Sequence, residues 1–142
     1  MSQAASLAFA LFRAPDASTF LRRVLALDAV TSGAMGVMLI AGAGVLGPLL
    51  NLPVPLLRGV GLSFIPFVAF VAFAATRTPA SRPLGLTVAI LNAVWVVASL
   101  WLLMSGKVAP NMLGTVFVAA QAVFVGILAE LQVIGARRLA AG

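Results

Sequence analysis

Four long apolar runs, separated by short segments rich in proline and polar residues, dominate the pattern of hydrophobic and polar positions. They cover about residues 21–47, 56–76, 84–105 and 112–135. Each has about the 20 apolar residues that a helix needs to cross a bilayer core of about 30 Å. Because a helix satisfies its own backbone within one segment, the pattern predicts an all-α membrane protein. We expect a four-helix transmembrane bundle that forms a single transmembrane domain over residues 1–142.

The segments outside the runs are short. Residues 76–83 and 105–111 are polar turns that contain proline. Residues 47–55 carry three prolines and no charge, so we expect them to break the helix and lie in the outer interfacial zone. Residues 3–13 are largely apolar and end in Arg13, whereas a secretory signal has its basic residues first. They are predicted to form a short interfacial helix, with a disordered tail as the alternative.

The composition narrows the chemistry that the chain can perform. Hydrophobic residues make up 63% of the chain and charged residues 8%, against about 25% charged in soluble domains. The absence of His and Cys removes the usual ligands of zinc, haem and iron–sulfur centres, and also thiol nucleophiles. We therefore expect no metal, no cofactor and no enzymatic activity.

The basic residues predict the orientation of the helices. The formal net charge is +6, and the basic residues stand at the ends of the apolar runs. Seven of them belong to one side of the predicted bundle: Arg13, Arg22, Arg23, Arg77, Arg82, Arg137 and Arg138. Only Arg58 and Lys107 belong to the other side. The positive-inside rule therefore places both termini in the cytoplasm, and the basic residues are expected to contact membrane lipids and not nucleic acid.

A short similarity between the first and third runs suggests an internal repeat. Asp28 lies in the sequence Leu-Asp-Ala-Val, and Asn92 lies in Leu-Asn-Ala-Val. The spacing of Pro55 to Gly59 is also that of Pro110 to Gly114. This pattern favours two helical hairpins in a parallel repeat, related by an axis along the membrane normal.

Polar residues within the apolar runs predict a candidate site. An ionisable group at the centre of a span costs about 2.5–3.5 kcal/mol and often marks function. Asp28 and Glu130 lie within about 11 Å of the arginines that flank their runs. Asn92 lies at a similar depth, and Thr31 and Ser32 share the helix face of Asp28. The candidate intramembrane polar site therefore comprises Asp28, Thr31, Ser32, Asn92, Trp95 and Glu130.

Two readings of these polar groups are open. Asp28 and Glu130 could form a proton or cation site, or the polar groups could form interhelical hydrogen bonds that fix the packing. Gln121 and Glu130 are nine residues apart, about 180° around a helix, so both cannot face one bundle centre. One of them should meet lipid, a neighbouring helix edge or another subunit, which points to a homo-oligomer or a membrane-protein partner.

The second run carries a ridge of phenylalanines at every third position. These residues are Phe64, Phe67, Phe70 and Phe73. They could line a cavity for a lipid or pigment, or they could serve helix packing and lipid contact.

The segments Leu21–Asp28 and Phe117–Gln132 resemble those of short, uncharacterised four-span proteins of the bacterial inner membrane. This resemblance implies an inner-membrane location and carries no activity with it. We therefore expect a small non-enzymatic membrane protein that binds a partner helix or a lipid-like molecule. The alternative is a small proton-coupled transporter or channel that uses Asp28 and Glu130.

Overall fold

The computed structural model describes Gln3 and residues 16–141. Within these residues the chain is all-helical, with no strand, and its four long helices are α2 (Ala17–Leu50), α3 (Val54–Thr76), α4 (Arg82–Met104) and α5 (Met112–Ala141). All four are long and apolar enough to cross a membrane. The prediction of an all-α protein with four such helices is therefore confirmed. The interfacial helix expected at residues 3–13 lies, apart from Gln3, outside the described residues.

The helix ends follow local capping rules. The Asp16 carboxylate accepts a hydrogen bond of 2.7 Å from the Thr19 backbone N–H and caps the start of α2. This backbone N–H holds the pKa of the Asp16 carboxyl below its ordinary value. α2 continues through Pro48 and ends at Asn51, which adopts the left-handed conformation with φ 54°. The helix is therefore broken within residues 47–55, as expected, although Pro48 itself is still helical; it removes one hydrogen bond of a helix that stops three residues later.

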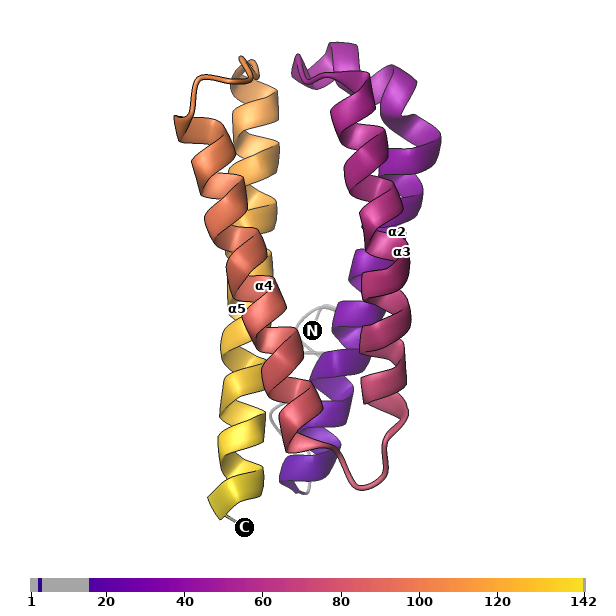
Figure 1. The fold of residues 1–142 in the computed structure, drawn as a ribbon, viewed down its shortest axis with the longest axis vertical. Coiled ribbons are helices and arrows are strands. Elements are labelled where there is room, and N and C mark those ends of the chain that lie inside the picture. The colour runs from indigo at the N-terminus through magenta and orange to yellow at the C-terminus, as the bar shows by residue number, and fades with distance from the viewer. Residues whose placement is uncertain (1–2, 4–15, 142) are drawn as a thin grey trace.

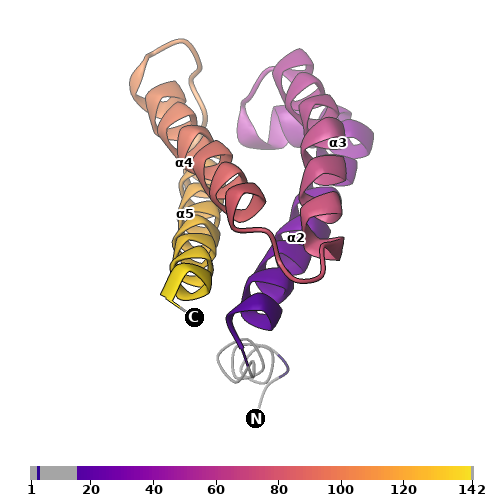
Figure 2. The same cartoon turned by 60° about the horizontal axis from the view of Figure 1, so that its bottom comes forward.

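The four helices form two hairpins (Figures 1 and 2). α2 packs along α3, and α4 packs along α5. The hairpins meet mainly through α2 and α5, whereas the backbones of α3 and α4 approach each other at few points. The closest backbone packing between the hairpins is therefore made by one helix from each.

Glycines let α2 and α3 approach closely. Gly36 and Gly61 face each other, and a Cβ added to Gly61 would lie 3.0 Å from the Gly36 carbonyl oxygen and 2.8 Å from the Ile40 side chain. Gly44, in contrast, has nothing within 4 Å of its Cβ position. Small residues at a helix contact are the usual means of packing helices tightly in a membrane.

The hairpins are joined at both ends of the bundle. At one end Phe20 and Val24 of α2 are buried against Leu128 of α5. At the opposite end Asn111 donates from its backbone N–H to the Leu50 carbonyl at 3.2 Å and from its side chain to the Leu49 carbonyl at 2.8 Å. These contacts hold α2 beside α5 above and below the middle of the bundle.

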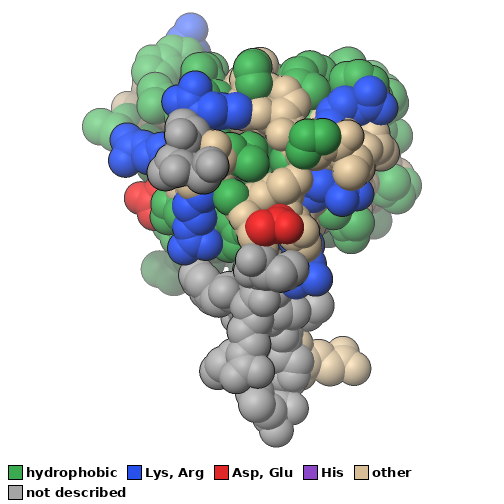
Figure 3. All heavy atoms as spheres, turned by 90° about the horizontal axis from the view of Figure 1, so that it is seen from below, with side chains coloured by type: hydrophobic (Ala, Val, Ile, Leu, Met, Phe, Trp, Pro, Cys, Tyr) green, Lys and Arg blue, Asp and Glu red, His purple; other side chains and the backbone are tan. Residues whose placement is uncertain are grey.

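The described arginines divide between the two ends as the sequence predicts. The end that holds the start of α2 and the end of α5 shows a gathering of Lys and Arg side chains (Figure 3). The helix boundaries place there Arg22, Arg23, Arg77, Arg82, Arg137 and Arg138. Arg58 and Lys107 lie at the other end, and Arg13 lies outside the described residues. Four helices suggest a multi-pass membrane protein; which end faces the cytoplasm stays a prediction.

Candidate functional site

A hydrogen-bonded network around Asp28 joins three helices in the bundle interior. Asp28 of α2 accepts from the Ser32 hydroxyl at 2.9 Å, from the Asn92 side-chain amide of α4 at 2.8 Å and from the Gln132 amide of α5 at 2.7 Å. The Asn92 amide also donates to the Gln132 oxygen at 3.0 Å. Asp28, Asn92 and Gln132 are 1%, 3% and 0% exposed, so the network is almost sealed from its surroundings.

The network stabilises a carboxyl group with neutral hydrogen-bond donors. The Ser32 hydroxyl and the Asn92 and Gln132 amides all donate to Asp28. Hydrogen bonds to a carboxylate are about twice as strong as those between neutral groups. Because the donors come from α4 and α5 as well as from α2, Asp28 ties the two hairpins together.

A second network lies about one helical turn from the first along α4. The Trp95 indole N–H donates to the Gln121 side-chain oxygen at 2.8 Å, and the Gln121 amide donates to the Ser99 hydroxyl at 3.0 Å and to the Val118 carbonyl at 2.9 Å. The Trp95 ring also meets the Phe64 ring edge-on, with 5.3 Å between centroids. Trp95 therefore has the hydrogen-bond partner that an indole within a membrane requires.

The structure does not bring all six predicted site residues together. Asp28, Ser32 and Asn92 share one network, Trp95 belongs to the next, and the Thr31 hydroxyl donates to the Leu27 carbonyl at 2.9 Å. Glu130 does not lie in the inward-facing layer that the sequence predicts. It is exposed and lines an outer groove between α4 and α5. The cause is helical phase: α5 turns Gln121 and Gln132 inward, and Glu130 lies away from that face.

Gln132 is the principal site residue that the sequence analysis missed. It lies two residues beyond Glu130, and its side chain carries no charge that would mark it within an apolar run. The available signal was its spacing of eleven residues from Gln121, which is close to three full helical turns and puts both amides on one face.

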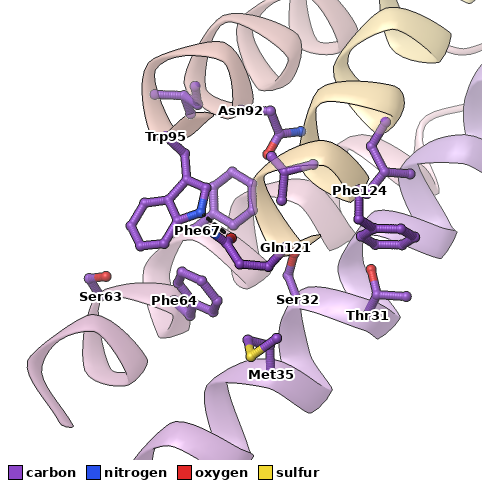
Figure 4. Close-up of a pocket in the computed structure, with 13 residues that line it drawn as sticks. Thr31, Ser32, Met35, Ser63, Phe64, Phe67, Asn92, Trp95, Gln121 and Phe124 are labelled. Carbon is purple, nitrogen blue, oxygen red and sulfur yellow. Dashed lines mark hydrogen bonds between the residues drawn. The ribbon is translucent and has the colours of Figure 1, made fainter. Parts of the chain in front are cut away.

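A cavity of about 260 Å³ lies between the two networks and the four helices (Figure 4). Its walls carry Phe64, Phe67, Trp95 and Phe124, and its polar groups come from Thr31, Ser32, Ser63, Asn92 and Gln121. An engineered apolar cavity of about 150 Å³ is large enough to bind benzene. This one is therefore large enough for a small organic group.

The cavity continues into a second one of about 230 Å³. The two share four lining residues, which are Met35, Phe64, Trp95 and Gln121. The second cavity extends toward Leu52 and Leu102, at the end of the bundle opposite the six arginines. Apart from Ser99 and Gln121, its lining is apolar. We call the two together the cleft.

The cleft opens between α3 and α4. Ser63 of α3 and Leu91 of α4 both line the first cavity, and both are exposed. In a membrane, this opening faces the lipid and not the water on either side.

The phenylalanine ridge of α3 is divided between the two roles that the sequence left open. Phe64 and Phe67 line the first cavity. Phe70 packs against a buried cluster, and Phe73 is 48% exposed with the Arg77 guanidinium 4.3 Å from its ring centroid. The ridge turns slowly around the helix, so only its first half lines the cavity.

Comparison with known proteins adds no relative to this description. No family model, no curated protein and no solved structure matches the chain. The fold and the cleft define its class by themselves: a four-helix, multi-pass membrane protein with a polar-floored cleft between two hairpins.

Proposed function

We propose that this chain is a small non-enzymatic integral membrane protein whose cleft binds a lipid-like molecule. The observation that carries the proposal is the cleft itself, with aromatic walls, a polar floor at Asn92 and an opening between α3 and α4. Ligand sites are mostly apolar concavities with a few placed polar groups. A molecule dissolved in the bilayer can enter this one from the side.

The shape of the cleft favours an elongated amphiphile. The polar groups gather in the first cavity, and the second cavity is nearly all hydrocarbon. A ligand would place its head near Asn92 and its tail toward Leu52 and Leu102. Such a tail would fill space that would otherwise leave the lining side chains without contacts.

Tryptophan fluorescence tests this proposal directly. Trp95 lines both cavities, and Trp101, which is 55% exposed, lines the edge of the second one only. Trp101→Phe keeps an aromatic ring there and leaves Trp95 as the only tryptophan, so this variant is the common background of every comparison. A brominated fatty alcohol and its methyl ether, in nanodiscs at known mole fractions, should quench Trp95 with saturation. Ala98→Phe fills the second cavity and should weaken this binding at least about tenfold through lost space.

Ala93→Phe is the matched control, because it makes the same change on the same helix but in the outer groove. It should leave quenching unchanged. Quenching that rises linearly for both probes, or that is the same in Ala98→Phe and the parent, would show only contact with bulk lipid and would exclude the proposal.

A partner helix is the second candidate, and Glu130 favours it. This carboxyl group is exposed in a membrane-facing groove whose lining includes Ala89, Ala93, Ala129 and Arg137. A charged group within a membrane is costly. A second copy or another membrane helix with a basic or amide side chain at this depth would relieve that cost. The same two variants test this candidate, with opposite expected results. Ala93→Phe should abolish the co-purification of a partner, and Ala98→Phe should retain it.

The transporter alternative has less support than either binding function. It requires Asp28 and Glu130 to act together, but Asp28 is buried with three donors, whereas Glu130 lies in the outer groove. A coupled proton would have to pass between two sites that do not share a cavity.

Three finer expectations remain part of the proposal. The parallel repeat is supported by the pair that the sequence matched, since Asn92 donates directly to Asp28 across the contact between the hairpins. The cytoplasmic location of both termini is supported by the arginine cluster at one end. An inner-membrane location follows from the resemblance of the sequence alone.

A further inference from the structure

The Asp28 carboxylate determines the orientation of the neighbouring amides. A carboxylate accepts hydrogen bonds and cannot donate them. Asn92 and Gln132 therefore both turn their NH₂ groups toward Asp28. The second N–H of Asn92 is taken by the Gln132 oxygen at 3.0 Å. Both donor positions of the Asn92 amide are thus occupied inside the network.

The Asn92 side-chain oxygen is left over and faces the cleft. No hydrogen bond from the described residues reaches it, yet every fully buried side-chain nitrogen or oxygen among these residues has a partner. This oxygen is therefore accessible, although Asn92 as a whole is only 3% exposed. Asn92 lines the first cavity, and Figure 4 shows its oxygen on the cavity side.

Other polar groups that line the first cavity also have no N–H or O–H group free to donate. The Ser32 hydroxyl donates to Asp28, the Trp95 indole donates to Gln121, and the Gln121 amide donates to Ser99 and to a backbone carbonyl. The oxygens of Ser32 and Gln121 still have lone pairs available. The floor of the cavity therefore offers hydrogen-bond acceptors, and its donors are already used.

We infer that the ligand of the cleft carries a hydrogen-bond donor at its head, as a long-chain alcohol or a protonated amine does. This inference rests on the proposed function and specifies its substrate class. The donor would bind the Asn92 oxygen, which receives no hydrogen bond from the described residues. A head group that only accepts hydrogen bonds, such as an ether or ester, would set oxygen against oxygen and leave Asn92 unsatisfied.

The same surroundings attract a positive head group. Phe64, Phe67 and Trp95 present aromatic surface to the first cavity, and Asp28 lies directly behind Ser32 and Asn92. Cations are attracted to aromatic faces and to a nearby carboxylate in a medium of low dielectric constant. An amine arm in the experiment therefore distinguishes a charged donor from a neutral one.

The test compares three brominated probes with the same chain: a fatty alcohol, its methyl ether and the primary amine. Saturable quenching of Trp95 is measured in the Trp101→Phe background, with affinities expressed per mole fraction in the bilayer. The alcohol should bind about tenfold more tightly than the ether, which is the value of one hydrogen bond to a confined acceptor. Asn92→Leu should abolish this preference, because it removes the acceptor oxygen.

The outcomes distinguish failure of this inference from failure of the proposed function on which it rests. Equal binding of alcohol and ether by the parent, or tighter ether binding, overturns the donor requirement while the lipid-binding function stands. A preference for the alcohol or amine supports it even if Asn92→Leu does not fold, because the comparison is made on the same protein. Absence of saturable quenching by all three probes removes the proposed function, and the donor requirement with it.

Discussion

At the scale of single residues, Asp28 is the point on which the bundle interior depends. Its two oxygens accept three hydrogen bonds, and two of them come from α4 and α5 in the opposite hairpin. The amides that donate them are buried. Loss of the acid therefore affects Asn92 and Gln132 as much as Asp28 itself, since a buried donor without an acceptor costs about 1–3 kcal/mol.

Two substitutions of Asp28 should differ sharply in stability. Asp28→Asn can turn its oxygen toward Asn92 and Gln132 and its amide toward Ser32, so we expect a loss of about 1 kcal/mol from the missing charge. Asp28→Leu leaves one N–H of Asn92 and one N–H of Gln132 without their acceptor and should cost about 2–5 kcal/mol. Thermal unfolding in mild detergent measures both.

A Leu variant as stable as the parent would refute the structural role of the network. A stable Asp28→Asn protein that lost a proton-driven activity of the parent would instead favour the transporter alternative, because an amide cannot exchange a proton in this range of pH.

The sequence predicts part of this site. The depths of Asp28 and Asn92 follow from counting residues into each span, and the structure joins them directly. The place of Glu130 could not be derived in the same way, because depth says nothing about direction around the helix. The spacing of nine residues predicts that Gln121 and Glu130 lie on opposite faces of the helix. It does not predict which of the two faces inward.

At the scale of elements, the contact of α2 with α3 is set by glycine. Gly36 and Gly61 meet where a Cβ on Gly61 would press on backbone atoms of α2, and a Cβ on Gly36 would press on the Phe64 side chain. The apolar runs predict where the helices lie, because a bilayer requires that length of hydrocarbon. They do not predict which helices pack together, since a helix that is apolar all round has no distinct face.

Gly61→Ala should destabilise the first hairpin by about 1–3 kcal/mol, because the new methyl group meets the Gly36 carbonyl and the Ile40 side chain. Gly44→Ala is the control in the same hairpin, where the added Cβ has open space around it. It should leave stability unchanged or raise it slightly, since alanine favours helix. Equal unfolding temperatures for the two variants would contradict the close contact.

At the scale of the whole molecule, charge separates the two ends of the bundle. Six arginines of the described residues gather where α2 begins and α5 ends, and only Arg58 and Lys107 mark the other end. Such a bias sets the direction of insertion. It also brings Arg138 over the Phe20 ring, at 4.9 Å from its centroid, next to the contact between the hairpins.

Reporter fusions at several positions should all agree with a single orientation of the bundle in the membrane. Fusions after Arg82 and after Gly142 are expected to report the cytoplasm, and a fusion at Lys107 the opposite side. A cytoplasmic signal at Lys107 would reverse the assignment of the two ends. Replacing both Arg22 and Arg23 by neutral residues should reduce the bias and give mixed signals at Lys107, because insertion follows the basic residues near the helix ends.

The sparse contact between α3 and α4 has a consequence for selectivity. A ligand that enters sideways has already left water, so its aqueous affinity is the product of partitioning into the bilayer and transfer into the cleft. Each methylene adds about 0.8 kcal/mol to the partitioning. It adds little to the transfer, because lipid tails are as apolar as leucine side chains. Chain length thus governs how much of a compound the membrane holds, and the head group governs which compound occupies the protein.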